Sequence, residues 1–190
     1  PFMSIYIPSS YQNDPASAKV LADTLIYMID GIIAAHPDKF ARGDSPEMIE
    51  NNFEKGLISL PMGMENGAPL ISLDDIRYYY SKGIRYVTLT HGKDNHICDS
   101  SYDTTATWGG LSPYGLKAIA EMNNIGMIID VSHISDKTFY QVMEHSRAPV
   151  LATHSSCRFF TPGWERNMSD EMIVELGKHG GVIQINFGSD

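Results

Sequence analysis

The chain has 190 residues, of which 43% are hydrophobic, and its formal net charge is −9. This length allows one domain with a substantial core but falls short of the roughly 250 residues of a complete eight-unit β/α barrel. The acidic balance argues against nucleic acid as a partner, because such proteins cluster Lys and Arg. Asp30 interrupts the best apolar run, residues 25–35, so we expect no transmembrane segment.

Strand-like and helix-like segments alternate in the first half of the chain. In order we expect a strand at residues 1–8, a helix at 14–36, a break at 37–46, a strand at 56–65 and a helix at 73–81. The second strand ends on Glu65, and Gly83 suits the position after the second helix. The composition of residues 1–8 is that of a strand already under way at residue 1, so we expect one domain, 1–190, truncated at both ends.

The second half continues this alternation. In order we expect a strand at 84–91, a loop at 92–112, a helix at 113–124, a strand at 126–133, a helix from Ser135, a strand at 149–156, a helix from Ser169 and a strand at 181–187. About six strands with intervening helices predict an α/β fold, an incomplete portion of a (β/α)8 TIM-type barrel. A doubly wound open sheet is the alternative, but no glycine-rich phosphate loop follows a strand.

Four consecutive predicted strands end on groups that bind metal, namely Glu65, His91, His133 and His154. The carboxyl ends of parallel strands meet at one face, so these side chains should converge. Imidazole and carboxylate suit Zn²⁺, and a carboxylate can bridge two ions that attack and polarise a carbonyl. The pattern predicts a metal site with hydrolytic chemistry.

The remaining polar residues have simpler interpretations. The other histidines lie in loops or at helix ends, where we expect solvation: His36, His96, His145 and His179. The 92–112 loop is long enough to be a lid, with Trp108 over a small substrate. We expect its carboxylates, Asp94, Asp99 and Asp103, to be solvated. The two cysteines, Cys98 and Cys157, are too few for a disulfide framework and can pair or stay free.

Three strand-end segments carry a family resemblance. They are GIRYVTLTH at residues 83–91, GMIIDVSH at 126–133 and ATHSS at 152–156. In combination they resemble the membrane (renal) dipeptidase family of binuclear zinc peptidases, and the likeness runs from residue 2 to residue 187. It implies a zinc-dependent dipeptidase that hydrolyses the peptide bond of free dipeptides through a metal-bridging hydroxide.

The resemblance also implies residue roles. Glu65 would bridge two Zn²⁺ ions, although the family often has Gly where this chain has Asn66. His133 and His154 would bind one of the ions, and His91 would bind substrate and stabilise the oxyanion.

Arg166, followed by Asn167, matches the arginine that holds the substrate's terminal carboxylate. From spacing alone, a surface arginine paired with Glu165 is the simpler interpretation. Arg158 is a rival that lacks the following Asn.

The resemblance places two further parts of the site outside these residues. A His-x-Asp pair for the second zinc should precede residue 1, and a catalytic aspartate should follow residue 190. We therefore expect the 190 residues alone to be inactive. The implied partner is a dipeptide substrate, a homodimer stays open, and the family favours a periplasmic, secreted or membrane-anchored parent.

Two alternatives stay open. Another binuclear metal amidohydrolase, acting on a cyclic or acylated amide, would share the histidines without a carboxylate clamp. A non-catalytic metal- or peptide-binding protein of the same fold would lack the upstream His-x-Asp pair.

Overall fold

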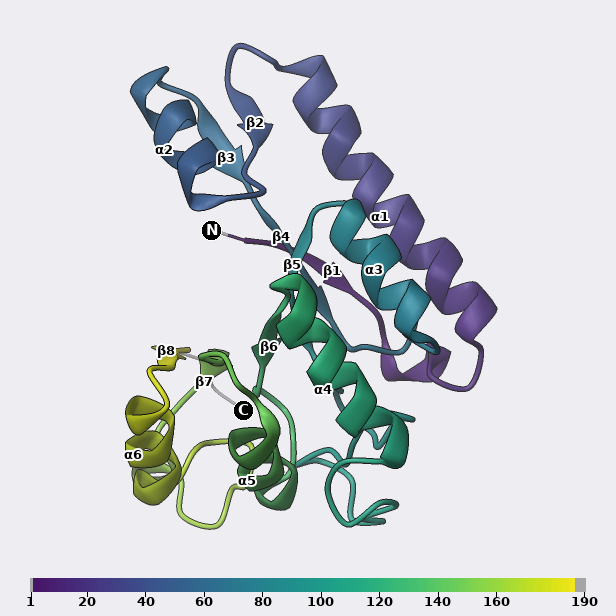
Figure 1. The fold of residues 1–190 in the computed structure, drawn as a ribbon, viewed down its shortest axis with the longest axis vertical. Helices are drawn as coiled ribbons and strands as arrows, with labels where there is room; N and C mark the ends of the chain where they lie inside the picture. Colours follow the sequence, from purple (N-terminus) through teal and green to yellow (C-terminus); the bar gives the residue numbers. More distant parts are fainter. Residues whose placement is uncertain (1, 187–190) are drawn as a thin grey trace.

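The computed structural model describes residues 2–186, which are built around one six-stranded parallel sheet (Figure 1). Its strands are β1 (Met3–Tyr6), β4 (Met62–Glu65), β5 (Ile84–Thr88), β6 (Ile128–Asp130), β7 (Leu151–Ser155) and β8 (Val182–Ile185). They lie side by side in that order. Sequential parallel strands with intervening helices form a half-barrel, which confirms the predicted portion of a TIM-type fold.

Helices follow one another around the outer side of this sheet (Figure 1). They are α1 (Pro15–Ala35), α3 (Leu73–Ser81), α4 (Pro113–Ile125), α5 (Asp136–His145) and α6 (Asp170–Lys178). Each begins after an Asp or Ser whose side chain accepts a backbone N–H of the first turn. Such caps satisfy donors that the helix itself leaves free, so the polar residue fixes where each helix starts.

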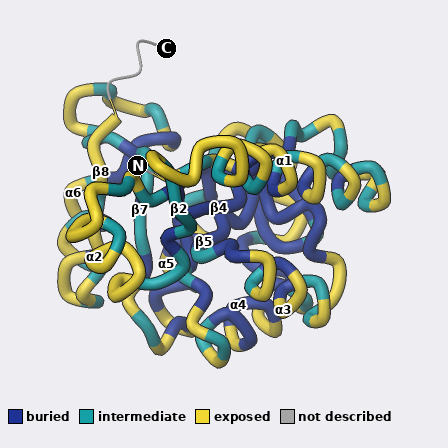
Figure 2. Tube along the Cα trace, turned by 90° about the horizontal axis from the view of Figure 1, so that it is seen from above, coloured by how far each residue is buried: buried dark blue, intermediate teal, exposed yellow. Residues whose placement is uncertain are grey.

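The sheet carries an apolar row beside a polar row. Ile5, Met64, Val87 and Ile129 lie in register across four strands and are buried in the core. Figure 2 shows buried residues gathered at the strands and at the helix faces turned toward them. The next row is Tyr6, Glu65, Thr88 and Asp130. Because successive residues point to opposite faces, this polar row faces away from the apolar one, at the carboxyl ends of the strands.

One predicted strand is wrong in detail. Residues 56–65 form two strands, β3 (Ile58–Leu60) and β4, which belong to different sheets on either side of Pro61. β3 pairs with β2 (Phe40–Arg42), which lies inside the predicted break, and α2 (Pro46–Glu54) packs on this pair. Proline cannot donate a ladder hydrogen bond, so it suits the point where the chain leaves one sheet for the other.

Three other expectations concern the ends, the helices and the cysteines. Residues 1 and 187, at the ends of two predicted strands, lie outside the described part of the chain. Among residues 2–186, no helix combines the length and apolar character needed to cross a bilayer. Cys98 is buried, Cys157 is half-buried, and both are free thiols.

Candidate metal centre

The four strand-end residues singled out in the sequence reach one place from four neighbouring strands. Glu65 is the last residue of β4, and His154 lies within β7. His91 and His133 lie beyond the ends of β5 and β6, on the turns that follow, so the predicted strands were slightly too long. His133 has a φ of 70°, a left-handed conformation that costs a non-glycine residue about 1–3 kcal/mol. The surrounding fold therefore holds this histidine in an unfavourable backbone conformation.

The four side chains, hereafter the strand-end cluster, converge on one oxygen. Glu65 Oε1 lies 3.6 Å from His91 Nε2, 3.5 Å from His133 Nε2 and 3.2 Å from His154 Nε2. His133 Nε2 and His154 Nε2 are 2.8 Å apart. The other carboxylate oxygen, Glu65 Oε2, accepts a 3.1 Å hydrogen bond from Ser4 Oγ on β1. The structure thus brings together all three predicted metal ligands.

The donor set fits a divalent cation. Glu65, His91 and His133 each offer a ligand atom, and these atoms lie within 4.8 Å of one another. His154 is not one of these three, but its Nε2 lies 3.2 Å from Glu65 Oε1 and 2.8 Å from His133 Nε2. Nitrogen and carboxylate ligands of this kind suit zinc. The resemblance gives His91 a role in binding substrate, but His91 also lies near enough to Glu65 and His133 to be a metal ligand. The metal content of a His91 variant separates these two roles.

Burial and mutual contacts set the charges in the cluster. Burial lowers the pKa of His133 to about 4 and also lowers the pKa of His91. Burial opposes ionisation of Glu65, yet its close contacts with His133 and His154 outweigh burial and hold the pKa of Glu65 well below the usual range. An ionised Glu65 beside a neutral His133 imidazole is the protonation state that a metal ion requires of these two ligands.

Arg166 lies against the cluster and is buried, so the simpler interpretation of a surface arginine is wrong. Its Nη1 donates to Ser155 Oγ at 3.0 Å and its Nη2 to the His154 carbonyl at 2.5 Å. Nη2 also lies 3.2 Å from His133 Nε2. The rival, Arg158, instead forms a paired hydrogen bond with Asp136 on α5.

A cavity of about 280 Å³ joins the arginine to the cluster. Its lining comprises Glu65, His91, Tyr102, His133, His154, Trp164, Arg166, Asn167 and Asn186. This volume is near the lower end for small-molecule sites. Tyr102 is the loop residue that reaches the cavity, whereas the predicted cover, Trp108, is not in the lining and donates its indole N–H to the Asn95 carbonyl.

Two residues near the cluster depart from the sequence expectations. Asn66 has a φ of 79°, which explains why Asn can stand where the family often has Gly, since Asn tolerates this conformation better than most residues. Asp130, buried at the end of β6, was not singled out. Its position inside an apolar segment was the available signal, because a buried carboxylate needs partners.

The loop carboxylates and one histidine are also less solvated than expected. Asp94 and Asp99 are buried and accept backbone N–H groups of the 92–112 loop. His96 is half-buried, its Nε2 lies 2.9 Å from the Leu70 carbonyl, and burial lowers its pKa. The hydrogen bonds of these groups stabilise the conformation of the loop, so we assign them a structural role.

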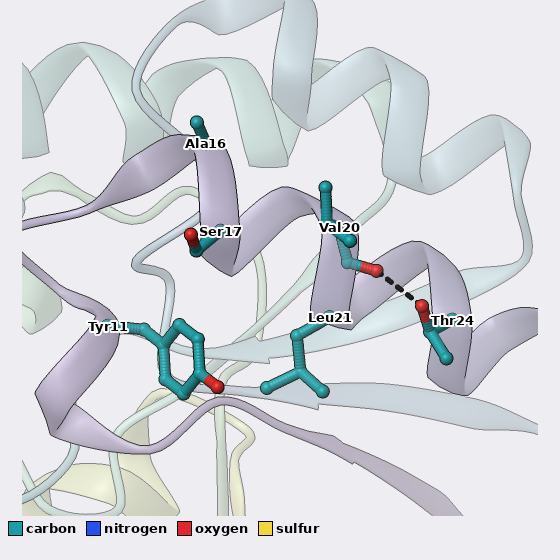
Figure 3. Close-up of a pocket in the computed structure, with 6 residues that line it drawn as sticks. All are labelled: Tyr11, Ala16, Ser17, Val20, Leu21 and Thr24. Carbon is teal, nitrogen blue, oxygen red and sulfur yellow. Dashed lines mark hydrogen bonds between the residues drawn. The ribbon is translucent and has the colours of Figure 1, made fainter.

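A separate hollow of about 440 Å³ lies along α1, far along the chain from the histidines (Figure 3). Its lining is Tyr11, Ala16, Ser17, Val20, Leu21 and Thr24, and the Thr24 hydroxyl is already bonded to the Val20 carbonyl. It contains no ionisable group other than the Tyr11 phenol. The smaller cavity at the strand ends contains the carboxylate, the imidazoles and the guanidinium. It is therefore the candidate site, although the hollow along α1 has the larger volume.

Comparisons with known proteins identify the family of this chain. The family model of membrane dipeptidases (peptidase family M19) matches residues 1–190. An uncharacterized dipeptidase of Schizosaccharomyces pombe is 40% identical over 138 residues, 71% of this chain and 33% of that protein. Dipeptidase verJ of Clonostachys rogersoniana is 33% identical over 195 residues, 98% of this chain and 50% of that protein. The crystal structure of the probable dipeptidase PvdM from Pseudomonas aeruginosa has a TM-score of 0.85 at 31% identity, covering 90% of this chain and 44% of that one.

The chain thus spans between 33% and 50% of the length of these two curated relatives. The family model nevertheless matches it throughout, which confirms the resemblance carried by the three strand-end segments. The chain belongs to the membrane dipeptidase family, peptidase family M19.

Proposed function

We propose that the protein containing this chain is a zinc-dependent dipeptidase that hydrolyses the peptide bond of free dipeptides. The observation that carries the proposal is the convergence of Glu65, His133 and His154 beside the buried Arg166. One half of this arrangement suits a metal ion and the other half suits an anion, which is what cleavage of a substrate with a free carboxylate needs.

In this proposal His133 and His154 hold one zinc ion together with Glu65. Glu65 would bridge to a second ion, a role that its two carboxylate oxygens permit. Bound zinc would supply an activated water and polarise the scissile carbonyl. The chain's own contribution is to keep Glu65 ionised and the His133 imidazole neutral, through the contacts and burial described above.

Arg166 would bind the substrate's terminal carboxylate. A guanidinium offers a planar pair of N–H donors that matches a carboxylate, and the contacts to Ser155 and His154 keep the side chain at the cavity. Binding the terminus at a fixed distance from the metal ligands would select the first peptide bond and restrict the enzyme to very short peptides.

His91 would stabilise the negative charge that develops on the attacked carbonyl oxygen. It lines the cavity, and its ring centroid lies 4.3 Å from that of His133. A donor placed beforehand at the developing oxyanion lowers the barrier without moving during the reaction.

Hydrolysis of a free dipeptide and of its C-terminally amidated form, by the full-length protein with and without zinc, tests the proposal. We expect chelation to abolish cleavage of the free dipeptide, zinc to restore it, and the amidated form to be a poor substrate. Equal cleavage of both forms would favour an amidohydrolase with no carboxylate clamp. Binding of zinc without cleavage of either dipeptide would favour the non-catalytic alternative.

A further inference from the structure

Asp130 is buried where the strands that carry the histidines end, and its two oxygens are fully used. Oδ1 accepts the backbone N–H groups of Ser132 at 3.0 Å and Thr153 at 2.9 Å. Oδ2 accepts the hydroxyls of Thr88 at 2.5 Å and Thr153 at 2.6 Å. One carboxylate therefore ties β5, β6 and β7 together just below the strand-end cluster.

This tie replaces part of a weak strand pairing. The paired register of β6 and β7 contains the single pair Asp130 and Leu151. Beyond it, the β7 backbone donates to side chains of the β6 segment: Thr153 N–H to Asp130, and His154 N–H to Ser132 Oγ at 3.1 Å. On the side that faces β6, the position of His154 is thus set by side chains, while β7 pairs with β8 on its other side.

The same contacts determine which nitrogen of His154 carries a proton. Thr153 Oγ1 lies 2.7 Å from His154 Nδ1. A hydroxyl has one proton, and a carboxylate that already receives donors can only accept, so Thr153 gives its proton to Asp130. The Thr153 oxygen is then an acceptor for a proton on His154 Nδ1, which leaves the Nε2 lone pair free toward Glu65 and His133.

We propose that Asp130 and Thr153 are positioning residues that fix His154 in its Nδ1–H tautomer and so prepare Nε2 to bind metal. The proposal rests on the proposed zinc site. It assigns a function to two residues that do not themselves reach the cation. Outer contacts of this kind orient a ligand and typically change metal affinity by about 10- to 100-fold when they are lost.

Thr153→Val in the full-length protein is the main test, because valine keeps the branched shape and the backbone N–H to Asp130 while removing the hydroxyl. We expect zinc affinity, measured by competition with a chelator, to fall about 10- to 100-fold. Thr153→Ser keeps the hydroxyl and should bind zinc as the wild type does. Thermal unfolding of the metal-free variants checks that both are folded.

The tautomer can be read without zinc. In the metal-free protein labelled with ¹⁵N-histidine, we expect His154 to be protonated at Nδ1 in the wild type and in Thr153→Ser, and to lose this preference in Thr153→Val. Wild-type zinc affinity together with an unchanged tautomer in Thr153→Val would overturn the inference. His154→Ala separates the two claims: if it keeps its zinc the metal site itself is wrong, whereas if it loses zinc while Thr153→Val does not, only the positioning role fails.

Discussion

The strand-end cluster and the 92–112 loop both bury charged groups, yet they satisfy them differently. In the loop, Asp99 accepts the backbone N–H groups of Trp108 and Gly110, at 2.9 and 2.7 Å, so each oxygen has a protein donor. In the cluster, Glu65 Oε1 and three imidazole nitrogens crowd around one another instead. Buried groups matched by backbone donors organise the fold, whereas groups that converge on each other are arranged for something outside the chain.

The largest expected effect is loss of the metal ligands. In the full-length protein, Glu65→Gln, His133→Ala and His154→Ala should each lower zinc affinity by more than about 100-fold, because removing a ligand should cost more than removing an outer contact. Metal analysis of the purified variants measures this. Unchanged zinc content in all three would remove the distinction between the cluster and the loop.

Loss of the carboxylate-binding arginine should be the next largest effect. Arg166→Ala should cost about 2–5 kcal/mol in kcat/KM on a free dipeptide, since a charged hydrogen-bonding partner is lost. Arg166→Lys keeps the charge without the planar pair of donors and should lie in between. Steady-state kinetics on free and amidated forms of one dipeptide decide the role. Equal losses on both forms would mean that Arg166 supports the fold and does not bind the carboxylate.

His91 sharpens the comparison inside the cluster. His91→Ala should keep its zinc while kcat falls about 10²- to 10³-fold, the usual effect of removing one oxyanion donor. Metal content and kcat measured on the same preparation separate the two roles. A variant that loses zinc along with activity would make His91 a ligand.

The loop should respond in stability and leave the metal unchanged. Asp99→Asn replaces one acceptor with a donor facing a backbone N–H, so we expect the free energy of unfolding to fall by about 2–3 kcal/mol. Asp38→Asn, at an exposed position, is the matched control and should change little. Chemical denaturation and metal analysis check both effects, and a loss of zinc in a folded Asp99→Asn protein would contradict the structural role.

The smallest effect concerns pH in the metal-free protein. Burial lowers the pKa of His133 from 6.5 to about 4, so the unfolded chain binds the proton more tightly. The free energy of unfolding should therefore be highest above about pH 6.5 and fall by about 1–3 kcal/mol as the pH drops toward 4. His133→Asn should reduce this dependence while His36→Gln, at an exposed position, leaves it intact. If the free energy of unfolding depends on pH equally in the wild type and in His133→Asn, His133 is not the buried group that causes this dependence.

Much of the fold could be predicted because its signals are local. The helix at 73–81 has the predicted bounds, since Ser72 caps its start and Gly83, with a φ of 97°, follows its end. The short strand β2 and helix α2 were missed, because a three-residue strand and a helix without buried residues leave little periodic signal.

The site was predictable only where residues share a topological position. Glu65 and His154 lie at the ends of predicted strands, and that placement alone brought them together. The partners of Asp99 and Asp130 could not be predicted, because they depend on the path of a loop and on register across three strands. Sequence patterns therefore located the groups that converge, while the contacts that hold them required the structure.

The central claim is that zinc binds among Glu65, His133 and His154. Anomalous diffraction from crystals of the full-length protein, recorded on both sides of the zinc absorption edge, tests it most directly. We expect a zinc peak about 2.0–2.2 Å from the Nε2 atoms of His133 and His154 and from a carboxylate oxygen of Glu65. A zinc-loaded crystal whose anomalous peaks lie away from these three side chains would contradict the account.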